Sequence, residues 1–258
     1  MITSVDVEPV DPAVADGCVR IAAVGDLHVG LDDEVPTFDD IELHADVLML
    51  AGDLTRRGRP EEAERLAASL ERVEVPVVAV LGNHDVHLDM GAEVTGVLGS
   101  VGVRVLDGDA CCVELDGHLV GVAGVKGFAG GMAGVAVSSF GEPEMKAFAS
   151  LGAEDAGRLQ SALGSLGTAV RVVLLHYSPV RDTLEGEPPE IHCFLGDYRL
   201  AEVVDHCGAD LVLHGHAHRG REHGRTSGGT PVRNVAQPVI RAPYRVYQLP
   251  VAAPDRWA

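Results

Sequence analysis

Short runs of aliphatic residues recur along the chain, and glycine or histidine with other polar residues follows each run. The runs are the segments at 19–24, 47–51, 75–81, 170–175 and 211–213. Such near-continuous aliphatic runs are typical of strands that are buried on both faces, as in a mainly parallel sheet covered by helices. Because ligands gather beyond the carboxyl ends of such strands, we expect the polar residues after the runs to share one site.

Helical patterns separate several of these runs. The segment RPEEAERLAASLERV predicts an amphipathic helix that begins at Pro60, with Glu61 and Glu62 suited to its positive end. Further helices are expected near 154–166 and 198–206, and the tail segments TPVRNVAQPV and YRVYQLP predict two more strands. Strands alternating with helices indicate an α/β fold.

The middle of the chain has a different pattern. The segments VGVRVL, ACCVELDG and HLVGVAGV are separated by short Asp-Gly turns at 107–108 and 116–117, which predicts antiparallel strands. The segments 126–144 and 181–196 show no clear period and are expected to be long loops. We expect loops in the ranges 126–150 and 181–197 to overhang the site, in roles that the sequence does not specify.

The length and composition favour one globular domain. A chain of 258 residues, with 46% hydrophobic and 23% charged residues, is within the range that one core supports. We therefore expect a single domain over 1–258, with the motifs in 20–236 and a short acidic lead at 1–17. No internal repeat, linker or low-complexity segment interrupts it.

The charge of the chain restricts its partners. Acidic residues number 39 and basic residues 20, which gives a net charge of -19. Such a chain repels anionic membranes and long nucleic acids, so neither is expected as a partner. If the substrate is itself anionic, bound metal ions are the obvious source of positive charge.

Cysteine usage and the N-terminal segment favour a cytoplasmic protein. The five cysteines are odd in number and form no CxxC pair, so neither a disulfide framework nor a thiolate zinc site is indicated. The N-terminus lacks the basic and apolar regions of a signal peptide, and no window approaches the roughly 18 apolar residues of a membrane span. We expect a protein that is neither exported nor embedded in a membrane.

The polar residues after the runs are carboxylates, imidazoles and one amide. In chain order they are Asp26, His28, Asp53, Asn83, His84, His176, His216 and His218. This oxygen and nitrogen set suits manganese, iron or zinc. On an extended segment alternate residues point the same way, so each Asp-x-His or His-x-His pair can present two ligands to one side. Taken singly, however, such an Asp is more often a turn or cap residue than a ligand.

The complete ordered set resembles the calcineurin-like metallophosphoesterase superfamily. That family has the blocks DxH, GD, GNH[DE], a lone His and GHxH. The chain carries them as Asp26-Leu27-His28, Gly52-Asp53, Gly82-Asn83-His84-Asp85, His176 and Gly215-His216-Ala217-His218. Five separated blocks in the correct order are far more specific than any one of them.

The resemblance implies a fold, two metal ions and an activity. The fold is two facing mixed β-sheets flanked by α-helices, a four-layer αββα sandwich. One divalent metal would be held by Asp26, His28 and His218, and the other by Asn83, His176 and His216. Asp53 would bridge the two ions. A hydroxide that bridges the metals would attack phosphorus in line, and His84 would protonate the leaving oxygen.

One departure concerns the branch of the family. In the protein serine/threonine phosphatase branch the GD block reads GDxxDRG, and its second Asp orients the catalytic His. Arg56 stands at that position here, which argues against this branch. The tautomer of His84 must then be fixed by another group, either Asp85 or a backbone carbonyl.

Four further residues are candidates for contact with the ligands or the substrate. On an extended segment the side chain of His214 would point the same way as those of His216 and His218. It either donates a hydrogen bond to a metal ligand or packs in the strand end. Arg56 and Arg219 lie beside motif blocks and could contact substrate phosphate, although an exposed arginine is the commoner outcome. Asp85 is the fourth candidate, as a group that could orient His84.

The sequence thus predicts a metal-dependent phosphoric ester hydrolase that acts on a small molecule. We expect a phosphodiesterase on a substrate such as a nucleotide, with a phosphomonoesterase on a small metabolite as the alternative. A non-catalytic metal-binding scaffold or interaction module is the alternative of a different class. The natural substrate, the native metals and the oligomeric state are not indicated.

Overall fold

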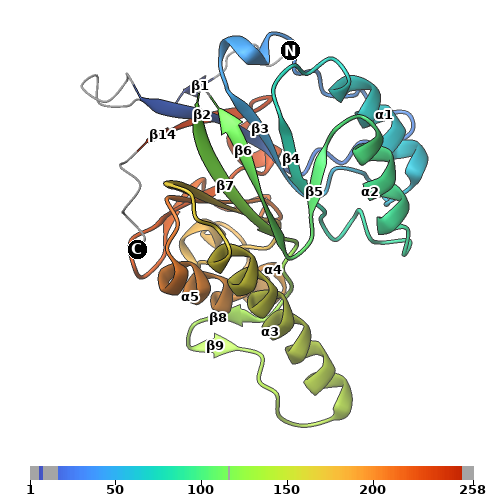
Figure 1. Ribbon diagram of the computed structural model, residues 1–258. Coiled ribbons are helices and arrows are strands. Elements are labelled where there is room, and N and C mark those ends of the chain that lie inside the picture. The colour runs from blue at the N-terminus through green and yellow to red at the C-terminus, as the bar shows by residue number, and fades with distance from the viewer. Residues whose placement is uncertain (1–5, 8–16, 116, 252–258) are drawn as a thin grey trace.

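Two six-stranded sheets lie face to face, with helices on their outer sides (Figure 1). The structure is a computed structural model that describes residues 6–7, 17–115 and 117–251. The expected acidic lead at 1–17 therefore falls almost wholly outside the described residues.

The first sheet is mixed. In spatial order its strands are β1 (Asp6–Val7), β14 (Arg245–Pro250), β2 (Cys18–Val24), β3 (Val47–Ala51), β4 (Val77–Val80) and β5 (Arg104–Leu106). Strands β2 to β5 are parallel, and β14 pairs antiparallel with β2. The three aliphatic runs of the N-terminal half therefore lie side by side with their carboxyl ends at one edge.

The second sheet repeats this design. In spatial order its strands are β12 (His223–Arg225), β13 (Pro231–Asn234), β11 (Leu211–His214), β10 (Val170–Leu175), β7 (His118–Val125) and β6 (Asp109–Leu115). The four inner strands are parallel, and the edge strands β6 and β12 are antiparallel to their neighbours. The expectation of two mixed sheets is confirmed.

Alternation along each strand builds the layers. In β2, Ile21 and Ala23 pack in the core between the sheets, whereas Ala22 and Val24 pack in the core beneath helices. Helices α1 (Pro60–Leu70) and α2 (Gly91–Ser100) cover the first sheet, and α3 (Pro143–Gly164) and α5 (Tyr198–Cys207) cover the second. Both faces of the inner strands are buried, as their unbroken aliphatic runs predict.

The first helix begins where the sequence predicts. Pro60 occupies the first turn, and the buried Glu62 carboxylate accepts hydrogen bonds from the backbone N–H groups of Arg57 and Arg59. These two groups lie ahead of the helix, where no helical carbonyl is available to them. The expected strands in the tail and the helix near 198–206 are also present, as β13, β14 and α5.

One expectation about the middle of the chain is wrong. β6 and β7 pair antiparallel as expected, with Leu115 opposite His118, although Asp116 lies outside the described residues. β5, by contrast, runs parallel to β4 in the first sheet, and the chain crosses to the second sheet after it. Leu106 is buried between the sheets, and the Gly108 N–H donates to the Gly124 carbonyl at this crossing. The Asp-Gly turn therefore joins two sheets rather than two adjacent strands.

The expected loop at 126–144 and helix at 154–166 also need correction. The loop contains the short hairpin of β8 (Gly131–Met132) and β9 (Val135–Ala136), and α3 begins at Pro143, well before 154. Residues 143–147 are all exposed, so these first turns have no buried face that would give a helical period. β9 and the start of α3 project from the body of the molecule, whereas β8 is buried (Figure 1).

The second irregular segment is mostly turns. It contains the 3-10 helices η2 (Asp182–Leu184) and η3 (Pro189–Ile191) and the single-turn helix α4 (His192–Leu195). Two other short elements, η1 (Ile41–Leu43) and α6 (Gln237–Ile240), had no signal in the sequence. Among the described residues, none of the helices has the length and apolarity needed to cross a membrane.

The core between the sheets should be intolerant of truncation. Leu213 is fully buried there, so Leu213→Ala is expected to lower the free energy of unfolding by about 2–5 kcal/mol through lost burial and a residual cavity. Leu119→Ala is the matched control, because Leu119 is 54% exposed. Urea unfolding followed by circular dichroism measures both. A Leu213→Ala loss no larger than that of the control would contradict this packing.

Candidate metal centre

The predicted polar residues converge at the carboxyl ends of five strands. Asp26 follows β2, Asp53 follows β3, and Asn83 and His84 follow β4; His176 follows β10, and His216 and His218 follow β11. The two sheets face each other, so these ends meet at one edge of the sandwich. Three overlapping groups of acidic and histidine side chains there have their candidate ligand atoms within 4.8 Å of one another.

The first group consists of Asp26, His28 and His218. His218 Nε2 lies 2.7 Å from Asp26 Oδ1 and 3.4 Å from His28 Nε2. His28 Nε2 lies 4.0 Å from the same Asp26 oxygen. Ligands that each lie about 2.1 Å from one ion are roughly 3–3.5 Å apart, and the three separations here, from 2.7 to 4.0 Å, bracket that spacing.

The second group consists of Asp53, Asn83, His176 and His216. His176 Nε2 lies 2.9 Å from Asn83 Oδ1 and 3.3 Å from Asp53 Oδ1. The rings of His176 and His216 are 4.8 Å apart between centroids. Asp53 also faces the first group, because its other oxygen, Oδ2, lies 3.8 Å from His28 Nε2. One carboxylate thus presents a different oxygen to each group.

His176 supplies the clearest sign that a cation fits here. Its Nδ1 lies 2.9 Å from the Ala51 carbonyl and is therefore the nitrogen that donates a proton. Burial lowers the pKa of His176 to about 3, so the ring is neutral near pH 7. Its Nε2 lone pair then points at the oxygens of Asn83 and Asp53. Asp53 Oδ1 accepts the His84 N–H, but no hydrogen lies between His176 Nε2 and either oxygen. A divalent cation among them would turn this repulsion into attraction.

Burial also shifts Asp26, His28 and His216 toward their neutral forms. Burial lowers the pKa of His28 to about 4 and that of His216 to about 3, which keeps both imidazoles unprotonated and able to ligate. Burial raises the pKa of Asp26 to about 6, against the hydrogen bond from His218. The hydrogen bond to Asp26 raises the pKa of His218. A proton shared by this pair is what a metal ion would displace.

His84 is oriented by the main chain. Its Nδ1 donates to the backbone carbonyl of Arg56 over 2.7 Å, and its Nε2 lies 3.9 Å from Asp53 Oδ2. Of the two candidate partners named from the sequence, the backbone carbonyl is the one in contact. The carbonyl belongs to the residue that replaces the Asp of the protein phosphatase branch.

Asp85 instead accepts hydrogen bonds that hold together the turns carrying the candidate ligands. Its fully buried carboxylate accepts hydrogen bonds from the backbone N–H groups of Leu54, Thr55 and Gly82 and from the Thr55 hydroxyl. Burial nevertheless raises the pKa of Asp85 to about 6. These bonds tie the turn after β3 to the turn after β4.

The backbone at the site is itself unusual. Asp26, His28, Asp53 and His216 all have positive φ, between 47° and 69°. Residues other than glycine rarely adopt this conformation, and such residues concentrate at functional sites. Close approach explains one motif glycine, because a Cβ at Gly82 would overlap the Asp53 carboxylate.

The remaining candidates lie near the site in other roles. His214 is fully buried and contacts the Gly215 carbonyl through Nδ1 and the Thr183 hydroxyl through Nε2, each over 2.8 Å. The Arg56 guanidinium pairs with Asp33 at 2.7 Å. Arg219 is exposed, and its backbone N–H donates to Glu187. His214 is thus packed in the strand end.

Two neighbours of the ligands had not been singled out. The Tyr177 ring lies 4.3 Å from that of His216 and 5.5 Å from that of His176, between centroids. Its place directly after His176 was the available signal. Glu187 is buried, and its carboxylate is among the charges that raise the pKa of His218. It comes from the irregular segment at 181–196, whose sequence gave no signal.

Comparisons with known proteins agree with this geometry. Residues 19–220 match the family described as calcineurin-like phosphoesterase. A search among curated proteins found no match. The solved phosphopantetheinyl hydrolase of Mycobacterium tuberculosis has a similar fold, with a TM-score of 0.62 and 16% identity over 89% of this chain and 95% of that chain.

A second solved structure is similar over this chain but belongs to a longer protein. It is a Staphylococcus aureus protein assigned as a 5′-nucleotidase, with a TM-score of 0.56 and 16% identity. The alignment covers 92% of this chain and 55% of that one. At these identities both likenesses concern the fold alone.

Manganese affinity should depend on pH through Asp26. The raised pKa means that protonation of Asp26 stabilises the metal-free fold at low pH, and that this contribution is lost as pH rises from the ordinary value of 3.8 to about 6. Metal binding needs the carboxylate, so the Kd for Mn²⁺ should rise about tenfold from pH 7 to pH 5. Titration calorimetry measures it. Equal Kd values at pH 5 and pH 7 would contradict the assignment.

Proposed function

The chain belongs to the calcineurin-like phosphoesterase family, and we propose that it hydrolyses a small phosphodiester such as a nucleotide at a site for two metal ions. The family is metal-dependent, and the chain has aspartate and histidine clusters that could form a binuclear site. The observation that carries the proposal is the convergence of Asp53, Asn83 and His176 lone pairs with no proton among them.

We assign the ligands as the geometry groups them. One ion would be held by Asp26, His28 and His218, the other by Asn83, His176 and His216, and Asp53 would contribute one oxygen to each. When bound, two divalent ions supply Lewis acidity, which activates water near neutral pH and neutralises charge on the phosphoryl oxygens. Manganese, iron and zinc all suit this donor set.

His84 is suited to act as the general acid. With Nδ1–H held by the Arg56 carbonyl, Nε2 is the nitrogen that faces Asp53 and the space between the groups. A proton on Nε2 can be given to the oxygen that leaves phosphorus, so that the departing group leaves as an alcohol. The side chain of His84 is 44% exposed, which allows contact with both solvent and substrate.

The charge around the site favours a diester over a monoester. Asp26, Asp53 and Asp85 are all buried there, in a chain of net charge -19. The guanidinium of Arg56 is already paired with Asp33. Two divalent ions carry four positive charges and these three carboxylates three negative ones, so the occupied site matches a diester, with one negative charge near pH 7, more closely than a monoester with nearly two.

A direct comparison of substrates tests the proposal. With saturating Mn²⁺, bis(p-nitrophenyl) phosphate should be turned over with a higher kcat/KM than p-nitrophenyl phosphate. A phosphopantetheinyl ester, the kind of substrate named for the Mycobacterium tuberculosis neighbour, belongs in the same panel. A preference for the monoester would favour a phosphomonoesterase instead. Hydrolysis of no ester, with fewer than two bound ions, would favour a non-catalytic scaffold.

His84→Asn should separate chemistry from metal binding. Loss of the general acid is expected to lower kcat on a diester by about 10²–10⁴-fold, because the leaving oxygen loses its proton donor. The Mn²⁺ stoichiometry should stay at the wild-type value, since the assigned ligands are unchanged. His87→Asn is the matched control, an exposed histidine three residues away. Equal kcat values in the two variants would remove His84 from the mechanism.

A further inference from the structure

A cleft opens beside the metal centre, among β5, α2 and α3. Its volume is about 780 Å³, within the ~300–1,000 Å³ of small-molecule sites. Leu81 and Val86 line it and flank the block that carries Asn83 and His84. The cleft therefore adjoins the side of the metal centre from which His84 acts.

Aromatic side chains connect the cleft to the metal centre. The Phe128 ring, which lines the cleft, lies 6.2 Å from the Tyr177 ring and 5.1 Å from that of Phe148 on α3, between centroids. Tyr177 in turn contacts His216. Of these rings only Phe128 lines the cleft, and Tyr177 and Phe148 pack next to it. Phe128 is only partly buried, which leaves ring surface for a ligand.

Lys126 adds a positive charge beside these rings. Its ammonium lies 5.2 Å from the ring centroids of both Phe128 and Tyr177 and donates to the Gly127 carbonyl. Its backbone carbonyl accepts the N–H groups of His176 and Tyr177, which fixes its position relative to the metal centre. Lys126 is one of only two lysines in the chain.

Lys126 is also the cation of the cleft that is free for a ligand. Arg158 is paired with Asp107 at 2.9 Å and with Asp155 at 3.2 Å. In the part of the chain that the structure describes, no carboxylate lies within the 4.0 Å ion-pair distance of the Lys126 ammonium. Two of its three N–H groups therefore remain available.

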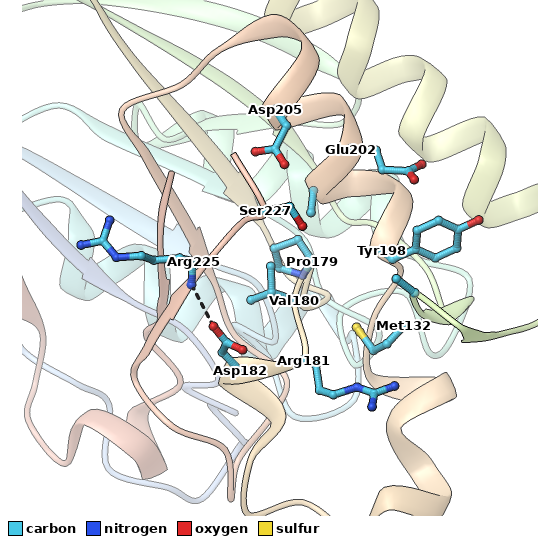
Figure 2. A pocket seen from close by; sticks show the side chains of 12 residues that line it. Met132, Pro179, Val180, Arg181, Asp182, Tyr198, Glu202, Asp205, Arg225 and Ser227 are labelled. Carbon is cyan, nitrogen blue, oxygen red and sulfur yellow. Dashed lines mark hydrogen bonds between the residues drawn. The ribbon is translucent and has the colours of Figure 1, made fainter. Parts of the chain in front are cut away.

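A second hollow, of about 490 Å³, lacks these features. It lies against α5, and among the described residues its lining contains neither a lysine nor a phenylalanine. Figure 2 shows that the guanidinium groups of Arg181 and Arg225 point away from each other and that the Tyr198 hydroxyl points out of the hollow. Its charged groups do not converge on one point.

We propose that the cleft beside the metal centre binds the organic part of the substrate, with an aromatic or nucleobase ring against Phe128 and a second anionic group on Lys126. The inference rests on the proposed diesterase function and narrows its substrate to a nucleotide-like diester that carries a further phosphate. In the hydrolysis, water oxygen bonds to phosphorus, the ester P–O bond breaks and a proton passes to the leaving oxygen. Phe128 and Lys126 join neither bond, so they determine specificity.

The acidic residues of the cleft fit the same ligand. Asp89 and Glu154 also line it, and both are exposed. Their carboxylates can accept hydrogen bonds from the amino and imino groups of a nucleobase. They also repel additional phosphates, which limits the ligand to a compact nucleotide rather than a polynucleotide.

Two pairs of probes test the two halves of the subsite. The p-nitrophenyl ester of thymidine 5′-monophosphate, with and without a 3′-phosphate, tests Lys126, because each pair has the same scissile bond. Phenyl and methyl p-nitrophenyl phosphate test Phe128 in the same way. Wild-type protein should favour the 3′-phosphate by about tenfold or more in kcat/KM, and the phenyl ester by about threefold to tenfold.

Matched variants assign these preferences to residues. Lys126→Gln should bring the 3′-phosphate ratio close to 1, with partial recovery in Lys126→Arg, whereas Lys146→Gln changes the exposed lysine and should keep the wild-type ratio. Phe128→Ala should abolish the phenyl preference, and Phe140→Ala, at an 85% exposed phenylalanine, should keep it. Each ratio compares two substrates on the same protein sample. A smaller fraction of folded protein therefore lowers both rates equally and leaves the ratio unchanged. Unchanged ratios in Lys126→Gln and Phe128→Ala would overturn the proposal.

A binding measurement separates the subsite from the activity. If wild-type protein hydrolyses no ester, the proposed function fails, and calorimetric titration with thymidine 3′,5′-bisphosphate then tests the cleft alone. Binding by wild type and by Lys146→Gln that weakens about tenfold or more in Lys126→Gln would support the subsite. Equal Kd values for Lys126→Gln and wild type, or no binding to wild type, would overturn it.

Discussion

The structure is organised around a group of hydrogen-bond acceptors that face one another. At the edge where the sheets meet, Asp53, Asn83 and the His176 Nε2 lone pair point at one another, and burial keeps the imidazole neutral. A few residues away, the equally buried Asp85 receives hydrogen bonds from the main chain and a hydroxyl. Within the described parts of the chain, Asp53 receives only one such bond, from the His84 N–H, and the lone pairs that face one another there suit a positive charge.

The strands were predictable because burial on both faces leaves a simple signal. The runs that became β2, β3, β4, β10 and β11 are aliphatic at nearly every position, since one face packs on the other sheet and one on helices. Because both faces of each strand are aliphatic, the sequence does not show which face packs on the other sheet and which on helices. The sequence alone therefore did not assign the strands to the two sheets. β5 shows the consequence, because its assignment depends on Leu106 packing between the sheets.

The polar side chains of the candidate site were predictable from the sequence, but the main-chain conformation that positions them was not. The eight polar residues stand directly after strands, and their ordered spacing resembles the family pattern. The positive φ angles of Asp26 and Asp53, by contrast, have only a weak signature, because Asp is enriched in this conformation but is also common in turns of other kinds. Lys126 and Phe128 belong to residue types that are rare in this chain, and they stand in the segment expected to be a loop. Their position near His176 depends on the parallel pairing of β7 and β10, which the sequence does not indicate.

The contact between His84 and the Arg56 carbonyl has a consequence for how such sites diversify. Where a side-chain carboxylate orients a catalytic histidine, the residue must be Asp or Glu, because other residue types lack that acceptor. A peptide carbonyl is present whatever side chain is attached to it. Position 56 can therefore vary in charge and size, as long as the turn keeps its path, without loss of the group that holds the imidazole. The choice of side chain at position 56 and the support of the His84 imidazole are therefore independent of each other.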